Sequence, residues 1–237
     1  MTIQHEPDFV GIVVAAGRST RFGGPIPKQV LEVGGRCVLE RSVRALADRP
    51  AVAGVVVVLA PEELNGPRLP RVRSWPGVLA LAAGGETRAD SVLRGLEAAP
   101  ASRFALVHDA ARPMASPELV DRVIEAARRE GAALPALPVP DTVKEVDPSG
   151  GVLRTVERSG LRLAQTPPGA RMDWLLDALR GAAAEGVEVT DEAAALERAG
   201  HRVTVVAGDP ANRKITSEED LEELRRRWAA EEPPLLR

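Results

Sequence analysis

A short loop rich in glycine and positive charge follows the first apolar segment of the chain. The run Ala15-Ala16-Gly17 stands directly after an apolar stretch that begins at Phe9, and Arg18, Arg21 and Lys28 follow in a loop with three glycines. Small residues at the carboxyl end of a buried strand let a ligand approach the backbone. Backbone N–H groups and fixed cations together suit a polyphosphate. The loop therefore predicts a polyphosphate site, although a basic surface loop can have the same composition.

The spacing within this loop excludes two common phosphate-binding motifs. It has neither the Gly-x-Gly-x-x-Gly fingerprint of dinucleotide-binding domains nor the Gly-Lys-Ser/Thr of a P-loop. A NAD-dependent oxidoreductase and an ordinary P-loop NTPase are therefore disfavoured.

A carboxylate follows a later apolar segment in the same way. Asp109 comes directly after the buried run 104–108, which predicts that it lies at the same edge of a parallel sheet as the first loop. Mg²⁺ commonly uses one or two carboxylates together with water and substrate phosphates, so Asp109 is a candidate metal ligand. The alternative for Asp109 is a turn or helix cap. His108 could be a general base, but a packed histidine is the better interpretation.

Two further segments carry weaker signals. Lys214 stands just before the last predicted helix and could reach the same phosphates, although a basic surface turn is the plain alternative. The run from Gly84 to Ser91 could be a second ligand loop beside a helix N-terminus, or an ordinary strand-to-helix turn.

Strand-length apolar runs alternate with segments of helical period along most of the chain. This alternation predicts an α/β fold with a mostly parallel sheet and helices on both faces. Strands are expected over 9–15, 52–59, 78–82, 104–108, 132–139 and 203–207. Helices are expected over 38–46, 90–98, 117–130, 172–185 and 191–199, and from 217 onward. Ser116-Pro117-Glu118 and the run from Ser217 to Asp220 have the residues of helix N-termini.

One segment interrupts the alternation. Residues 142–156 form two short strand-like runs around a Pro-Ser-Gly-Gly turn, which predicts an inserted β-hairpin. An isolated hairpin is marginally stable in water, which favours an arm that packs on a second subunit over a plain surface excursion. No linker or repeat divides the chain, so we expect one domain over 1–237 with 141–158 as the arm.

Composition limits the classes of partner. The 237 residues are 44% hydrophobic and 27% charged, with a formal net charge of −3, so nothing favours nucleic acid or a membrane as partner. The single cysteine, Cys37, is expected to be a small buried hydrophobe. The polar start of the chain resembles no targeting peptide, and we expect a cytoplasmic protein.

Six motifs together resemble those of the 2-C-methyl-D-erythritol 4-phosphate cytidylyltransferase family, over about residues 10–224. They stand in the matching order in this sequence. The matching runs are Ala15-Ala16-Gly17-x-x-x-Arg21, Pro27-Lys28-Gln29, Arg88-Ala89-Asp90-Ser91-Val92, His108-Asp109-Ala110-Ala111-Arg112-Pro113, Thr190-Asp191-Glu192-Ala193 and Lys214-Ile215-Thr216.

The resemblance implies a Rossmann-like domain, a homodimer joined through the hairpin arm, and transfer of CMP from CTP to a sugar-alcohol phosphate in non-mevalonate isoprenoid synthesis. It also implies a role for each matched position. Arg21, Lys28 and Lys214 would act on the phosphates as catalytic residues, and Asp109 would hold Mg²⁺. The nucleotide pocket would use Ala15, Ala16, Gly17, Gly85, Glu86 and Ser91. The acceptor would be bound by Arg112, Thr142, Arg158, Thr166 and Thr190.

Three positions depart from the family pattern. Glu86 stands where Asp is frequent, Val14 where Pro is common, and Pro168 where Gln usually follows Thr-Pro. None of them removes a cation, so they affect fine specificity rather than the chemistry.

The expected reaction needs no general base. The second pKa of a phosphate monoester is ~6, so the attacking phosphate oxygen is already ionised at neutral pH. The obstacle is repulsion between two anions, which positioned cations and Mg²⁺ reduce. Two alternatives remain: a ribitol 5-phosphate cytidylyltransferase of the same build, and a non-catalytic nucleotide-binding regulatory subunit.

Overall fold

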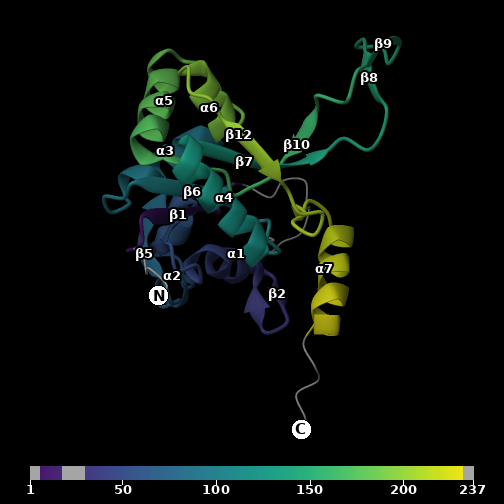
Figure 1. Cartoon of the computed structure of the whole chain (residues 1–237). Helices are drawn as coiled ribbons and strands as arrows, with labels where there is room; N and C mark the ends of the chain where they lie inside the picture. Colours follow the sequence, from purple (N-terminus) through teal and green to yellow (C-terminus); the bar gives the residue numbers. More distant parts are fainter. Residues whose placement is uncertain (1–5, 18–29, 232–237) are drawn as a thin grey trace, which may run out of the picture.

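The computed structural model describes residues 6–17 and 30–231, and an eight-stranded sheet forms its centre (Figure 1). In the parallel part of the sheet, β1 (Phe9–Val14) lies between β6 (Phe104–Asp109) and β4 (Val52–Leu59), and β5 (Val78–Ala83) pairs with β4. The middle strands are apolar along most of their length because helices cover both of their faces, and β6 ends in the polar pair His108 and Asp109. This confirms the expected mostly parallel sheet.

A short antiparallel strand joins the parallel part of the sheet just described to a second parallel pair, β7 (Ala132–Pro138) and β12 (Thr204–Ala207). β7 pairs with β12 on one side. On its other side it pairs with the short antiparallel strands β10 (Arg162–Ala164) and β11 (Gly169–Arg171), and β11 also pairs with β6. The sequence did not predict these two strands. The break between them, at 165–168, faces the end of β6.

Two groups of helices enclose the sheet. On one face, α1 (Val38–Ala47) and α4 (Pro117–Glu130) pack against side chains such as Phe9 and Val13, with α2 (Leu69–Arg73) nearby. On the other face, α3 (Arg88–Glu97), α5 (Met172–Ala184) and α6 (Glu192–Arg198) cover Val10 and Ile12. Helices on both faces are thereby confirmed.

The last helix packs on a small hairpin away from the main core. α7 (Glu218–Glu231) lies against β2 (Glu32–Val33) and β3 (Arg36–Cys37), and the Arg41 guanidinium stands 3.7 Å from the centre of the Trp228 ring. Cys37 is buried at the start of α1, as expected. No helix within 6–17 and 30–231 has both the length and the apolar character needed to cross a bilayer.

The predicted hairpin is present as β8 (Val143–Val146) and β9 (Val152–Val156). Figure 1 shows it projecting away from the rest of the described chain. Val152 and Leu153 on β9 are 63% and 61% exposed, which is unusual for large apolar side chains. An apolar surface of this kind is typical of an interaction site.

Helix starts follow the expected caps, with one correction. Ser116 accepts a hydrogen bond from the Leu119 N–H, and Ser217 and Asp220 bond to each other's backbone N–H. α3 begins two residues earlier than expected, because Thr87 and Asp90 form a reciprocal capping box ahead of it.

Candidate active site

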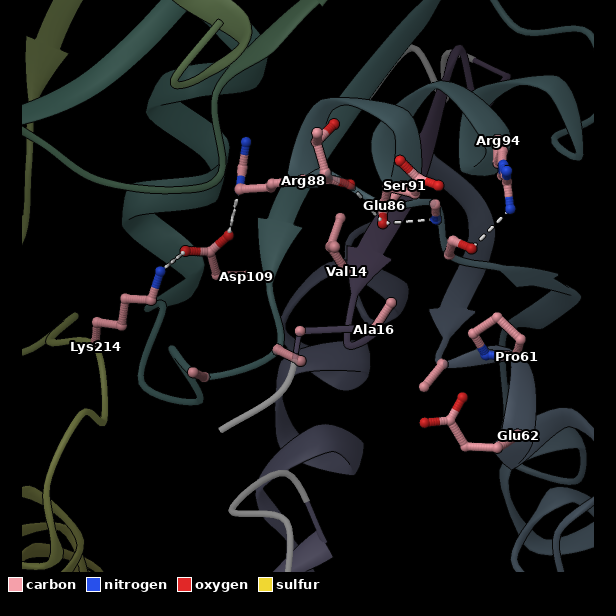
Figure 2. Close-up of a pocket in the computed structure, with 17 residues that line it drawn as sticks. Val14, Ala16, Pro61, Glu62, Glu86, Arg88, Ser91, Arg94, Asp109 and Lys214 are labelled. Atoms are coloured by element: carbon pink, nitrogen blue, oxygen red, sulfur yellow. Dashed lines mark hydrogen bonds and ion pairs between the residues drawn. The ribbon is translucent and has the colours of Figure 1, made fainter. Parts of the chain in front are cut away.

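A cleft of about 770 Å³ opens at the carboxyl edge of β1, β4, β5 and β6. Figure 2 shows Asp109 and Lys214 on one side of Val14 and Ala16, with Pro61 and Glu62 on the other side. Ligands of open α/β sheets bind at this edge, where loops rather than strands form the surface. The lining residues are Val14, Ala16, Gly17, Ala60, Pro61, Glu62, Gly84, Gly85, Glu86, Thr87, Arg88, Ser91, Arg94, Asp109, Ala110, Ala111 and Lys214.

The loop between β5 and α3 forms one wall through small residues and backbone hydrogen bonds. A Cβ atom on Gly84 would stand 2.2 Å from the Cβ of Ala16, so this contact requires glycine. The Ser91 hydroxyl accepts from the Gly85 N–H at 3.0 Å and donates to the Thr87 carbonyl. Arg94 donates to the Gly84 carbonyl at 2.7 Å. The loop is therefore held from several directions, and Glu86 stands exposed at its rim.

Asp109 is the centre of a cluster of charged side chains. Its Oδ1 accepts from Arg88 Nε at 3.1 Å and its Oδ2 from Lys214 Nζ at 2.8 Å. Burial opposes ionisation of Asp109, but the two cations outweigh it and hold its pKa well below the usual range. Asp109 is therefore a carboxylate at neutral pH, with one cation on each oxygen.

A second carboxylate lies behind Arg88. Glu192, the first residue of α6, accepts from the two terminal nitrogens of Arg88 at 2.6 and 3.3 Å and is only 2% exposed. Burial raises the pKa of Glu192, and the Arg88 charge opposes that rise. Both carboxylates raise the pKa of Arg88, against the effect of its own burial. One guanidinium thus joins the starts of two helices to the end of β6.

His108 is part of the structure of the site and is not available as a base. Its Nε2 lies 2.9 Å from the Arg112 carbonyl, which can only accept, so Nε2 carries the proton. The Thr166 hydroxyl then donates to Nδ1 at 2.9 Å and accepts from the Asp109 N–H at 3.1 Å. Burial lowers the pKa of His108 to about 4. Both ring nitrogens are used, in agreement with the packed histidine that the sequence favoured.

The loop that carries Lys214 is anchored to the break between β10 and β11. Asn212 is fully buried and donates to the Thr166 carbonyl at 2.7 Å. Gln165 donates to the Asp209 carbonyl at 2.8 Å and accepts from the Asp209 N–H. The Arg112 side chain donates to the Asn212 carbonyl. These bonds place a residue 105 positions away in sequence beside Asp109.

Comparison with known proteins identifies the family. The model of the family described as IspD, 2-C-methyl-D-erythritol 4-phosphate cytidylyltransferase, matches residues 9–225. The chain belongs to this family. A 2-C-methyl-D-erythritol 4-phosphate cytidylyltransferase from Stenotrophomonas maltophilia is 46% identical over 218 residues, which are 89% of this chain and 92% of the relative. The expected family and the expected nucleotidyltransferase class are both confirmed.

Solved structures of this cytidylyltransferase family have the same fold. The enzyme from Thermus thermophilus is 37% identical with a TM-score of 0.75, over 92% of this chain and 98% of that one. The 4-diphosphocytidyl-2C-methyl-D-erythritol synthase from Anaerococcus prevotii is 28% identical with a TM-score of 0.82, over 95% and 100%. Some relatives are longer: this chain spans 56% of a bifunctional IspD/IspF enzyme from Bradyrhizobium, at 45% identity.

Among the described residues, the expected site residues of this cytidylyltransferase family fall into three groups. Arg21 and Lys28 lie outside the described residues. Thr142 and Arg158 are exposed on the hairpin segment, outside the cleft lining, and Thr190 is exposed just before α6. Ala15 and Thr166 are buried beside the cleft, and Arg112 is half-buried behind Asp109. The residues in the cleft wall itself are Ala16, Gly17, Gly85, Glu86, Ser91, Asp109 and Lys214.

Several lining or supporting side chains were not singled out as site residues, among them Arg88, Glu192 and Arg94. Arg88 and Glu192 stand inside matched motifs, but nothing in their spacing indicates that they pair across 104 positions. Arg94 follows Arg88 by six positions on α3 and binds the loop carbonyl. The sequence did contain one indication of this contact: Arg94 stands within a predicted helix that follows the glycine pair Gly84-Gly85.

The donor set at Asp109 suits a metal that is held mainly by substrate. Within the described ranges no group of three or more histidine, cysteine, aspartate or glutamate side chains could hold a metal ion by itself. Asp109 supplies one ionised carboxylate in the cleft wall, with Arg88 and Lys214 beside it. Mg²⁺ is frequently bound by one or two carboxylates together with water and phosphates. The residues therefore fit a Mg²⁺ ion that arrives with a nucleotide.

Proposed function

We propose that this chain transfers CMP from CTP to 2-C-methyl-D-erythritol 4-phosphate and releases pyrophosphate, at the cleft at the carboxyl edge of the sheet. The family match over 9–225 supports the reaction, and one observation of geometry supports the place: Lys214 and Arg88 meet on Asp109 in the cleft wall. A cytoplasmic location is part of the same proposal.

The nucleotide would lie along the β5–α3 loop. The wall there is made of Gly84, Gly85 and Ala16, and the Ser91 hydroxyl is already committed within the loop. A flat pyrimidine fits a narrow wall of small residues, and backbone groups can distinguish its polar edge. Ala15, Gly17 and Glu86 border the same space and are proposed to complete the nucleotide site.

The phosphates would lie toward Asp109. The acceptor phosphate, already ionised, attacks the α-phosphorus of CTP, and the bond to the pyrophosphate oxygen breaks as the new P–O bond forms. Lys214, with Arg21 and Lys28 from the segment before Val30, would stabilise the charge that develops on the transferring group and on pyrophosphate. A Mg²⁺ ion held by Asp109 and the phosphates would neutralise part of that charge. His108 takes no part, since both of its ring nitrogens are hydrogen-bonded.

The acceptor site would require a second copy of the chain. Arg112, Thr166 and Thr190 stand near the Asp109 end, but Thr142 and Arg158 belong to the arm over 141–158, which projects from the body (Figure 1). Exposed Val146, Val152 and Leu153 give the arm an apolar surface. We propose a homodimer in which each arm delivers Thr142 and Arg158 to the partner subunit's cleft.

Pyrophosphate release tests the reaction and the acceptor together. The enzyme is incubated with Mg²⁺ and each of CTP, UTP and ATP, with methylerythritol phosphate or ribitol 5-phosphate as acceptor. Turnover confined to CTP with methylerythritol phosphate supports the proposal. Preference for ribitol 5-phosphate favours the alternative acceptor, and nucleotide binding without turnover on either acceptor favours a regulatory subunit.

Mixing two inactive variants tests the exchange of arms. Arg158→Ala and Lys214→Ala are each purified, unfolded together at equal amounts and refolded. If arms act across a two-fold dimer, half of the dimers are mixed and each has one intact site, which restores about a quarter of wild-type activity. If the mixture is no more active than the separate variants, the arm acts within its own subunit. The molar mass from light scattering gives the oligomeric state independently.

A further inference from the structure

Glu192 is a charged side chain with almost no contact with solvent. Its residue exposure is 2%, and it stands at the first position of α6, where the apolar residues Ala193, Ala195 and Leu196 are buried. A buried carboxylate is costly unless it is paired, and replacing buried ion pairs with apolar groups is often neutral for stability. Packing therefore gives no reason for a carboxylate at this position.

The single partner that explains Glu192 is Arg88. Both terminal nitrogens of the guanidinium face Glu192, at 2.6 and 3.3 Å, and its Nε remains for Asp109 Oδ1 at 3.1 Å. A bidentate pair fixes the plane of a guanidinium as well as its position. Because that plane is set by Glu192, the direction in which Nε points is set too. Figure 2 shows Arg88 reaching from α3 to Asp109, with Lys214 on the opposite oxygen.

The same pair joins two walls of the site. Arg88 begins α3, directly after the loop with Gly85 and Glu86, whereas Glu192 stands two residues after Thr190. Asp191 caps α6 by accepting from the Ala194 N–H at 2.8 Å, so the segment from Thr190 to Glu192 has a defined conformation. One ion pair thereby sets the distance between the nucleotide wall and the segment proposed for the acceptor.

We infer that Glu192 is a positioning residue of the transfer reaction: through Arg88 it fixes the Asp109 carboxylate and holds the Thr190 segment against the nucleotide wall. This inference rests on the proposed function. Groups that orient a metal ligand from behind contribute about 10- to 100-fold to activity or metal affinity. Glu192 would therefore affect the rate of transfer and metal binding more than nucleotide binding. The loop between β5 and α3, which is proposed to bind the nucleotide, is held by its own hydrogen bonds and does not depend on Glu192.

The test uses Glu192→Gln, Arg88→Gln and the double variant, with Glu197→Gln as matched control. Glu197 is an exposed residue of the same helix, so its substitution removes the same charge without touching Arg88. For each variant, kcat, the KM for CTP and the Mg²⁺ concentration for half-maximal rate are measured. Calorimetry of CTP binding with and without Mg²⁺ gives a readout that does not depend on turnover, and circular dichroism reports the fold.

Glu192→Gln should lower kcat by about 10- to 100-fold and weaken the Mg²⁺-dependent part of CTP binding, with the KM for CTP changed less than about threefold. Because Glu192 acts through Arg88, the double variant should be no more than about threefold slower than Arg88→Gln alone. The double variant leaves no buried charge without a partner, so it keeps the test open if Glu192→Gln does not fold.

Two results overturn the inference. One is a folded Glu192→Gln enzyme whose kcat and Mg²⁺ dependence match those of Glu197→Gln. The other is a double variant whose loss of kcat is the product of the two single losses. If the wild type itself releases no pyrophosphate with either acceptor, the proposed function fails first and the inference falls with it. An active wild type with either of the two results above refutes the role of Glu192 alone.

Discussion

The buried histidine beside Asp109 should make the stability of this protein depend on pH in a defined range. His108 is fully buried, its two ring nitrogens bond to the Arg112 carbonyl and the Thr166 hydroxyl, and burial lowers its pKa from 6.5 to about 4. The neighbouring charges of Arg112 and Arg88 lower it further, while Asp109 opposes them. In the unfolded chain the same imidazole has its ordinary pKa.

The sign and size of the effect follow from linkage. Between pH 6.5 and pH 4 the unfolded chain binds a proton at this histidine and the folded chain does not, so stability falls as pH falls. For pKa values of 6.5 and about 4, the loss between pH 7 and pH 5 is about 2 kcal/mol. The stability that Asp109 gains from its lowered pKa is lost only below its ordinary value of 3.8, outside this range. The raised pKa of Glu192 acts in the opposite direction.

Urea unfolding of the wild type and of His108→Gln at pH 7, 6 and 5 measures the difference. The variant should be less stable at pH 7, because the Arg112 carbonyl and the Thr166 hydroxyl lose their partner, but its stability should change by about 2 kcal/mol less over the range. Equal pH dependence in the two proteins would refute the assignment. If the variant does not fold, nitrogen NMR of the wild-type ring can decide. A charged His108 ring at pH 5 would contradict the structure.

Three further predictions concern the cleft. Lys28→Ala and Arg21→Ala should each lower kcat at least ~10²-fold at saturating substrates, and near-normal turnover in both would contradict their proposed roles. Gly84→Ala should raise the KM for CTP at least about tenfold, because its Cβ would stand 2.2 Å from the Cβ of Ala16 in the cleft wall. Gly181→Ala, at an open position of α5, should instead be neutral or stabilise by about 0.5 kcal/mol. Thr166→Val should lower the unfolding free energy by about 2 kcal/mol or more, since two buried groups lose a partner, and an unchanged urea midpoint would argue against that pairing.

The parts of the fold that the sequence predicted are those with a strong local pattern. β1 and β4 are continuous apolar runs, β6 begins with one over 104–107, and α4 carries Ser116, Pro117 and Gly131 at its ends. Parallel strands covered on both faces need apolar runs, and helices need capping residues at their ends. The sequence of each of these elements therefore contains what determines its structure.

The missed elements are stabilised by their neighbours. β10 and β11 have three residues each, and their sequences, Arg-Leu-Ala and Gly-Ala-Arg, have no strand pattern. They are strands because β7 and β6 present unpaired backbone groups to them. The strands of the hairpin of β2 and β3 are shorter still, with two residues each, and α7 covers them. Contacts of this kind form only in the folded chain.

The site residues also divide into those that a local sequence pattern predicts and those that only the folded chain brings together. Sequence reasoning placed Asp109 at the sheet edge because it follows a strand, and it gave Lys214 only as a residue that could reach the same phosphates. The two side chains meet at 2.8 Å. The same reasoning assigned no partner to Arg88 or Glu192, because a charge on a helix is usually a solvated one and only the packing of α6 against the sheet buries it. The direct contacts of the arm residues Thr142 and Arg158 remain predictions.

The balance of charge in the cleft indicates where the attraction for a polyphosphate must come from. The described lining contains three acidic residues, Glu62, Glu86 and Asp109, and three basic ones, Arg88, Arg94 and Lys214. Such a lining has no formal net charge, and two of its cations are already bound to Asp109. A triphosphate carries several negative charges, and a neutral cleft concentrates no counter-charge for it. The segment 18–29, which lies outside the described residues, contains three cations and no acidic residue. We therefore predict that the cluster at Asp109 orients the phosphates and that this segment supplies most of the binding charge, so that Arg21→Ala and Lys28→Ala lower turnover strongly.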